Sequence, residues 1–282
     1  YKEIIDNDYY YIDKTLLIRD LLIQKSKVTL FTRPRRFGKT LAQSMLRTFF
    51  EEEVAADGTI IDNSRYFVEK KIMDAGEQYT KHMGKYPVIF LSMKSAKQPD
   101  FETAYECLSD EIIKEYDRHR YLLNGSQLTE DIKERYSAIL MQKAGKSAYA
   151  TSLAFLSDCL EKYHHEKTII LIDEYDVPLE NAYFKGFYGR MVEFIRSLLE
   201  SALKTNDSLQ FAVITGCLRI SRESIFTGLN NLKINSVLNE SYAEHFGFIQ
   251  EEVDGLLSFY GIEQRRAEIK EWYDGYLFGY TE

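Results

Sequence analysis

Short unbroken runs of apolar residues alternate along the chain with longer segments in which apolar residues recur at helical spacing. The short runs are rich in β-branched and aromatic residues and predict strands at 28–32, 88–93, 168–174, 211–216 and 234–238. The longer segments predict helices at about 15–24, 39–50, 101–116, 129–143, 151–164, 187–205, 249–260 and 263–273. Strands that alternate with helices in this order predict an α/β fold with a parallel sheet and flanking helices.

The strand predicted at 168–174 contains an unbroken apolar run that ends in two acidic residues. Such a run is typical of a strand that is buried on both faces of a parallel sheet. In an open α/β sheet, ligands bind at the carboxyl ends of the strands, so we expect the functional residues there. The charged stretch 51–85 is interpreted as a surface excursion with short helices.

A phosphate-binding loop is predicted between the first strand and the helix that begins at Lys39. Gly38 lets the backbone approach a phosphate closely because it has no Cβ atom. The N–H groups at the start of the helix, together with the positive end of its dipole, favour an anion. Lys39 can reach the β and γ phosphates of ATP, and Thr40 can ligate Mg²⁺. The predicted nucleotide contacts are Arg35, Arg36, Phe37, Gly38, Lys39, Thr40 and Leu41.

One position departs from the usual P-loop pattern G-x-x-x-x-G-K-[ST]. The pattern places its first glycine at position 33, where this chain has Arg33, and Pro34 then fixes one backbone dihedral. We therefore expect the loop to follow a different path. The alternative interpretation is a basic surface turn, because Gly-Lys-Thr by itself is a weak signal. The flanking strand and helix favour the P-loop.

An acidic pair, Asp173 and Glu174, ends the strand at 168–174. In P-loop ATPases an Asp at this place holds Mg²⁺ through water, and the following Glu activates the attacking water. Two adjacent carboxylates after buried apolar residues are costly unless a cation or a donor uses them. We assign Asp173 and Thr40 to the metal and Glu174 to the catalytic base. The alternative is that the pair only opens a loop.

The neighbouring strands supply further candidates. The strands at 28–32 and 168–174 lead to the P-loop and to the acidic pair, and we call them the motif strands. The strand expected at 88–93 fits the ATPases in which another strand separates these two in the sheet. Strand order would then place Thr215 beside the γ-phosphate as a polar sensor, and the alternative is a hydroxyl that caps a turn. Arg219 and Arg222 follow, and an arginine can stabilise the transition state of phosphoryl transfer. Arg219 is included as a catalytic candidate, with a solvent-facing salt bridge as the competing interpretation.

Composition limits the class of protein without indicating an activity. The 282 residues are 45% hydrophobic and 28% charged, as in ordinary globular proteins. No apolar run approaches the ~20 residues that span a bilayer, so no membrane association is expected. The net charge of −8 argues against nucleic-acid binding over the whole surface, but not against a local basic site at 33–36. Three widely spaced cysteines predict a reducing cytoplasm rather than a zinc or disulfide site.

Five segments of the chain carry a resemblance to a known family: YYIDKT at 10–15, FTRPRRFGKT at 31–40, IDEYD at 172–176, SIFTGLNNL at 224–232 and WYDGY at 272–276. Together they resemble the bacterial AAA-ATPase-like family, and the loop at 31–40 is the most specific part. The resemblance makes Arg33 usual for the family and implies ATP binding. Members often carry a restriction-like PD-(D/E)xK nuclease domain downstream, which does not fit within these 282 residues.

We therefore predict a P-loop NTPase domain of the AAA or ASCE type at 1–240. The start of a C-terminal lid or winged-helix-like region is expected at 241–282, from the resemblance alone. The predicted function is Mg²⁺-dependent ATP hydrolysis coupled to an effector in a longer protein, with a nuclease domain and DNA as partners and an oligomer allowed. The alternatives are a nucleotide-gated module with little hydrolysis and a nucleic-acid-binding element that uses the arginines at 33–36.

Overall fold

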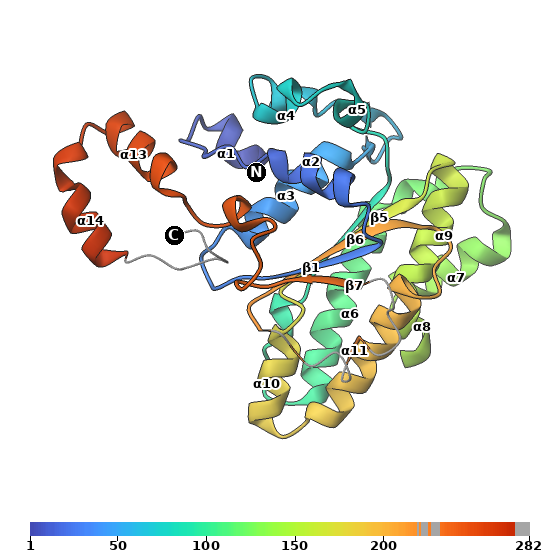
Figure 1. Ribbon diagram of the computed structural model, residues 1–282. Coiled ribbons are helices and arrows are strands. Elements are labelled where there is room, and N and C mark those ends of the chain that lie inside the picture. Colours follow the sequence, from blue (N-terminus) through green and yellow to red (C-terminus); the bar gives the residue numbers. More distant parts are fainter. Residues whose placement is uncertain (219, 221–224, 227–231, 274–282) are drawn as a thin grey trace.

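The centre of the molecule is a five-stranded sheet. The structure is a computed structural model, which describes residues 1–218, 220, 225–226 and 232–273. The sheet has the order β4-β5-β6-β1-β7, and every neighbouring pair is parallel. Its strands are β1 (Val28–Thr32), β4 (Val88–Ser92), β5 (Thr168–Asp173), β6 (Leu209–Gly216) and β7 (Leu232–Asn235). Figure 1 shows the twisted sheet with helices on both faces, which confirms the predicted α/β fold of the P-loop NTPase type.

The two motif strands, β1 and β5, are not neighbours in the sheet. β6 lies between them, and Ile214 pairs with Leu30 of β1 on one side and with Ile172 of β5 on the other. The predicted separation of the motif strands is therefore present, but β6 provides it. The strand expected at 88–93 is β4, which lies at the sheet edge beside β5. Because all five strands are parallel, their carboxyl ends share one edge.

Helices cover both faces of the sheet, so the central strands have no exposed face. Every residue of β1 and β5 is buried. One face packs against α2 (Leu16–Gln24) and α3 (Lys39–Phe50). The other packs against α6 (Phe101–Arg118), α9 (Ser152–His164), α10 (Val177–Lys185) and α11 (Tyr188–Leu203), with α7 (Glu130–Leu140) and α8 (Lys146–Ala150) beside them.

Alternation along the strands assigns each side chain to one of these two cores. Leu30 of β1 joins the core under α6 and α11, and the next residue, Phe31, joins the core under α2 and α3. In β5, Ile170 and Ile172 lie in the same core as Leu30. Ile169 and Leu171 lie in the same core as Phe31. This is the two-residue period of a pleated strand, and it explains why the sequence shows unbroken apolar runs.

The stretch 51–85 is only partly the surface excursion that the sequence predicts. It contains the expected short helices, together with a small hairpin: β2 (Glu53–Val54), β3 (Ile60–Ile61), η1 (Ser64–Phe67), α4 (Lys71–Asp74) and α5 (Glu77–Thr80). However, Tyr66, Phe67 and Ile72 are buried in the core under α3. Phe67 lies edge-on to Phe49 with 5.1 Å between the ring centroids. The segment therefore covers one face of the domain.

Two elements around the sheet differ from the sequence prediction. A separate helix, α10, precedes α11, and it begins with Pro178 in its first turn, a position that proline favours. The strand predicted at 234–238 ends earlier, at Asn235. A turn then begins, in which the Asn239 side chain accepts hydrogen bonds from the Ser236 backbone N–H and hydroxyl. A local hydrogen bond of this kind competes with the sheet ladder.

The C-terminal segment contains η4 (Ala243–His245), α13 (Gln250–Phe259), η5 (Glu263–Arg265) and α14 (Arg266–Trp272), and a short helix, α1 (Lys2–Asp6), begins the chain. Figure 1 shows α13 and α14 to one side of the sheet. Tyr242 and Phe246 are buried against Phe31, so the chain still packs on the sheet domain beyond residue 240. The proposed boundary at 240 and the role of a lid stay predictions. Within the described ranges, no helix is both long and apolar enough to cross a membrane.

Candidate active site at the carboxyl edge of the sheet

The predicted P-loop connects the end of β1 to the start of α3. The backbone N–H of Arg33 still donates to the Gly216 carbonyl oxygen, at 3.0 Å, so the loop begins as a continuation of the strand. Arg36 and Gly38 both have a left-handed backbone, with φ of 71° and 74°. Gly38 caps α3, and that conformation explains why glycine occupies the position. The loop therefore turns directly into the start of α3, where helix N–H groups are available for an anion.

Lys39 directs its amine back into this loop. The Nζ atom donates to the carbonyl oxygens of Arg33 at 3.0 Å and Pro34 at 2.8 Å, and it lies 3.3 Å from Cys217 Sγ. These three partners account for the three hydrogens of an ammonium group. The two carbonyls are strong acceptors, whereas a thiol is a weak one. The thiol contact is therefore the one that a phosphate oxygen can replace at least cost.

Asp173 is held between two threonine hydroxyls. Its Oδ2 atom accepts from the Thr40 hydroxyl at 2.6 Å, and its Oδ1 atom accepts from the Thr215 hydroxyl at 2.5 Å. The Asp173 side chain is buried, so a charge there needs such donors. A hydroxyl that donates its proton keeps its oxygen lone pairs free for a cation. Thr40 and Asp173 together offer oxygen ligands, which Mg²⁺ prefers.

The donor set fits a magnesium ion shared with a substrate better than a metal held by protein alone. Among the residues described by the structure, no three His, Cys, Asp or Glu side chains gather in a cluster that could hold a metal. Mg²⁺ is usually bound through one or two carboxylates, with waters and substrate phosphates completing its shell. One hydroxyl and one carboxylate at the start of α3 and the end of β5 match that pattern.

Glu174 directly follows Asp173 and has a left-handed backbone, with φ of 56°. This conformation is unfavourable for a residue with a Cβ atom, and such residues occur often at functional sites. Burial, and then the neighbouring Asp173 carboxylate, raise the pKa of Glu174 above its usual value. A raised pKa brings a carboxylate closer to the range that suits a general base. The position and the electrostatics are both compatible with the predicted role.

Gln43 lies at the site, although it was not among the residues predicted from the sequence. Its side chain is fully buried on α3, one turn after Lys39. Its Nε2 atom donates to the carbonyl oxygens of Ile172 at 3.2 Å and Val213 at 3.1 Å, and to Thr215 Oγ1 at 3.3 Å. The sequence did carry a signal, because Gln43 is a polar residue on the apolar face of the predicted helix.

Tyr175 and Asp176 hold the turn that follows β6, and the sequence reading gave them no separate role. Asp176 Oδ2 accepts from the backbone N–H groups of Cys217 at 2.9 Å and Leu218 at 2.7 Å. The Tyr175 hydroxyl donates to the Leu218 carbonyl oxygen at 2.7 Å and accepts from the Ile220 N–H. These contacts place Cys217 against Lys39. Burial raises the pKa of Asp176, because its carboxylate has left water.

The arginines at 33–36 do not form one surface patch. Arg33 is completely buried, and its Nη1 atom donates to the Asn235 carbonyl oxygen at 2.8 Å. Its guanidinium also lies over the Phe246 ring, 5.2 Å from the centroid, and burial lowers its pKa to about 10. Only Arg35 and Arg36 are exposed. The predicted basic patch is therefore wrong in its extent.

The other predicted residues are either partly buried beside the loop or outside the described residues. Phe37 and Leu41 are partly buried and pack against the core under α3. The carbonyl oxygen of Phe37 accepts from the Gly247 N–H at 3.3 Å, which joins the loop to the C-terminal segment. Arg219 and Arg222 lie outside the described residues, so their predicted roles stay predictions.

A model of the family described as Predicted AAA-ATPase matches residues 1–226. The chain belongs to this predicted AAA-ATPase family. The match includes the loop at 33–38, the carboxyl ends of β1, β5 and β6, and the turn that Asp176 holds. The helices α13 and α14 lie beyond it. The resemblance found in the sequence is thus confirmed at the level of the family.

Among curated proteins, this predicted AAA-ATPase is similar to an "Uncharacterized protein in vnfD 5'region" from Azotobacter chroococcum mcd 1. The two are 26% identical over 273 residues, which is 96% of this chain and 45% of the other. The chain therefore spans less than half the length of that relative. No solved structure matches the chain.

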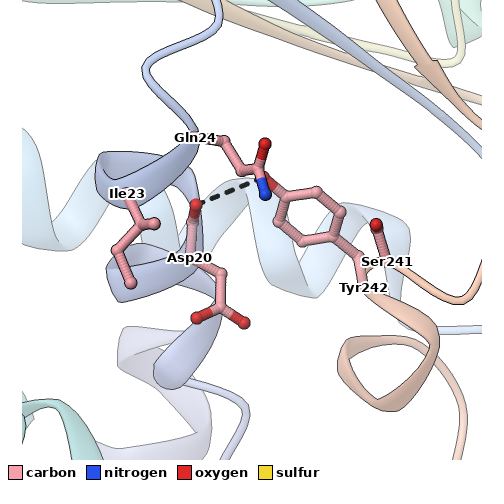
Figure 2. A pocket seen from close by; sticks show the side chains of 5 residues that line it. All are labelled: Asp20, Ile23, Gln24, Ser241 and Tyr242. Atoms are coloured by element: carbon pink, nitrogen blue, oxygen red, sulfur yellow. Dashed lines mark hydrogen bonds between the residues drawn. The ribbon is translucent and has the colours of Figure 1, made fainter.

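A small hollow lies elsewhere on the molecule, lined by none of the residues of this site. Figure 2 shows this pocket between α2 and the chain at 241–242, where the Tyr242 hydroxyl donates to the Asp20 carbonyl oxygen at 3.3 Å. Its lining residues are Asp20, Ile23, Gln24, Ser241 and Tyr242. None of them is among the predicted site residues.

Proposed function

We propose that this member of the predicted AAA-ATPase family binds ATP together with Mg²⁺ at the carboxyl edge of its sheet and hydrolyses it. The observation that carries the proposal is the convergence of Lys39, Thr40 and Asp173. Lys39 and Thr40 begin α3 directly after the loop, and Asp173 ends β5. Thr40 Oγ1 lies 2.6 Å from Asp173 Oδ2, and the Lys39 amine is turned into the loop beside them. This combination serves phosphate and metal binding in P-loop proteins.

The loop would bind the phosphates through fixed donors. The free N–H groups at the start of α3 and the Lys39 amine face the region where β1, β6 and the loop meet. On binding, a phosphate oxygen would replace Cys217 Sγ at Lys39, while the carbonyls of Arg33 and Pro34 keep the amine in place. Arg35 and Arg36 are exposed beside the loop and can contact the nucleotide from outside.

Magnesium would supply positive charge that offsets the negative charge developing on the phosphates. Thr40 would present its oxygen to the metal while its hydroxyl still donates to Asp173, so neither side chain has to turn. Asp173 would be kept in position from its other side by the Thr215 hydroxyl. The threonine assigned as a sensor thus also supports the metal ligand.

Glu174 would act as the general base. It lies next to Asp173 at the end of β5, and its raised pKa favours acceptance of a proton from an attacking water. Arg219 stays a proposed stabiliser of the transition state, outside the described residues. A nucleotide-gated module with little hydrolysis uses the same binding site, and Glu174→Gln separates the two because it removes only the base.

The burial of Arg33 weakens the alternative of a nucleic-acid-binding element. Such an element requires the arginines at 33–36 on the surface, and Arg33 is buried under Asn235 and Phe246. DNA and a nuclease domain enter our proposal only as parts of a longer protein that ATP would control. The support is that the chain spans 45% of its curated relative.

The three free cysteines support the proposal of a reducing cytoplasm.

Hydrolysis tests the proposal directly. We would measure phosphate release from ATP by the purified chain with Mg²⁺, and with EDTA in its place. The wild type should release phosphate only with Mg²⁺, and Glu174→Gln should lower the rate by about 10²–10⁴-fold. Phosphate release that is equal in wild type and variant would exclude Glu174 as the base, and equal release close to background would favour the gated module.

A further inference from the structure

We propose that Gln43 is the positioning residue of this site: through the Thr215 hydroxyl it fixes the orientation of Asp173 toward the metal. This inference rests on the proposed function, because it assigns a role within the same Mg²⁺ and nucleotide site. Gln43 lies on α3 beside the carboxyl-terminal parts of β5 and β6. It contacts Ile172 of β5, and Val213 and Thr215 of β6.

The direction of the Gln43 amide is fixed by two backbone carbonyls. Its Nε2 atom lies within 3.2 Å of two backbone carbonyl oxygens, those of Ile172 and Val213. Carbonyl oxygens only accept, so the amide must present its nitrogen rather than its oxygen to the strands. The positions of the amide nitrogen and oxygen of Gln43 are therefore determined by its neighbours.

The Thr215 hydroxyl lies 3.3 Å from Gln43 Nε2, which can only donate to it. The two hydrogens of the amide are shared among three acceptors, this hydroxyl and the carbonyl oxygens of Ile172 and Val213. The single proton of the hydroxyl is then available for an acceptor on another side. Two acceptors are present: Asp173 Oδ1 at 2.5 Å and the Ile172 carbonyl oxygen at 3.4 Å. The carboxylate oxygen is both the nearer and the charged acceptor, so the Thr215 proton goes to Asp173.

Asp173 is almost completely buried and has one hydroxyl donor on each oxygen. Gln43 supplies a donor to the Ile172 carbonyl, so that carbonyl does not depend on the Thr215 proton. Without Gln43, the carbonyl competes with Asp173 Oδ1 for this proton. Whenever the proton turns to the carbonyl, the carboxylate is held only through Thr40, which is also the expected metal ligand. Groups that orient a metal ligand typically change metal affinity by about 10–100-fold.

A purely structural role would have different consequences. Gln43 also ties α3 to the sheet, so its loss is expected to lower stability whatever happens at the metal. Thr48 provides the comparison on the same helix. It is 4% exposed, and its hydroxyl donates to the Ser44 carbonyl oxygen at 2.8 Å, away from β5 and β6. Thr48→Val therefore removes a buried polar contact of α3 without touching Asp173.

The test compares Gln43→Met, Thr215→Val, the double variant and Thr48→Val. Methionine keeps the length of the side chain but has no donor. For each protein we would measure the melting temperature with ADP as a function of Mg²⁺ concentration, and with ADP and EDTA as the metal-free reference. The readout is the Mg²⁺ concentration that gives half of the metal-dependent shift, a binding measurement that does not depend on turnover.

We expect Gln43→Met to raise this Mg²⁺ concentration about 10-fold while metal-free ADP binding changes less than about 3-fold. The double variant should resemble Thr215→Val within about 2-fold, because both changes act through the same hydroxyl. Thr48→Val should lower the melting temperature and leave the Mg²⁺ requirement unchanged.

An unchanged Mg²⁺ requirement in Gln43→Met, or effects that multiply in the double variant, would overturn the positioning role and leave the proposed function intact. If Gln43→Met does not fold, Thr215→Val decides alone, and an unchanged Mg²⁺ requirement there also overturns it. A wild type without any Mg²⁺-dependent shift would instead remove the proposed function, and the positioning role with it.

Discussion

The Thr40 hydroxyl donates to the Asp173 carboxylate at 2.6 Å, although the two residues are 133 positions apart in the chain. This contact joins the first turn of α3 to the end of β5. It is made in a sheet where β6 separates the strands that lead to the two residues. The separation leaves the carboxyl end of β6, with Thr215, between the loop and the acidic pair.

Glu174→Gln should change stability in a pH-dependent way. Burial and the Asp173 carboxylate raise the pKa of Glu174 above its usual value of 4.5. The folded state therefore favours the protonated form, and its contribution to stability is lost as the pH rises through the raised pKa. Glutamine mimics the protonated form. The variant should melt a few degrees above the wild type at pH 8, and at the same temperature near pH 4.

Melting curves of both proteins between pH 4 and pH 8 would check this. The matched control is Glu180→Gln, because Glu180 lies one helix away and contacts Arg35 only at 3.5 Å. A stability difference for Glu174→Gln that is constant with pH would contradict the account of its electrostatics.

Asp176→Ala should loosen the turn after β6. Two backbone N–H groups, those of Cys217 and Leu218, lose their shared acceptor. We expect the free energy of unfolding to fall by about 1–2 kcal/mol, as measured by urea denaturation. In a Cys107→Ser background, Cys217 should also react faster with a thiol reagent, because its position against Lys39 is no longer fixed. Asp176→Asn keeps an acceptor oxygen and should lie between the two. Equal thiol reactivity in all three proteins would contradict the role of the turn.

Gly216→Ala tests how closely the end of β6 approaches the segment after β5. A Cβ atom at Gly216 would lie 2.6 Å from Asp176 Oδ1 and 2.6 Å from the Tyr175 ring. Neither group can move easily, because both are hydrogen-bonded to the turn. We expect a loss of about 1–3 kcal/mol in the free energy of unfolding.

Gly189→Ala is the matched control for this change. Gly189 is in the first turn of α11, and its Cβ would meet no atom within 4 Å. Alanine favours helices, so this variant should be as stable as the wild type or slightly more so. Equal stability of the two alanine variants would show that the close approach at Gly216 has no energetic cost.

The sequence predicted most of the fold because its strands are buried on both faces. The apolar runs of β1 and β5 could not be mistaken for surface segments, and Gly38-Lys39-Thr40 identified the loop between them. The end of β7 was predicted too late because the Ser236 turn depends on a side-chain hydrogen bond that apolar spacing does not show. Order in the sheet was also beyond the sequence, since pairing of β6 with both motif strands is a tertiary property.

The sequence prediction included the residues that are expected to touch a ligand, and it missed the residues that hold them in place. Lys39, Thr40 and Asp173 belong to a recognisable spacing, whereas Gln43 and Asp176 act on backbone groups far away in sequence. Arg33 shows the opposite error. Its charge and its neighbours suggested a surface patch, but its side chain satisfies a carbonyl and an aromatic ring inside the fold.

Binding of ATP to the wild type and to Lys39→Ala, measured by calorimetric titration with Mg²⁺, tests the central claim most directly. Lys39 is the amine that would meet the phosphates, and Lys185→Ala, an exposed position at the end of α10, is the matched control. We predict saturable binding by the wild type and by Lys185→Ala, and a loss of at least about 100-fold in affinity for Lys39→Ala. No binding by the wild type at millimolar ATP, or equal affinity in Lys39→Ala, would contradict the account.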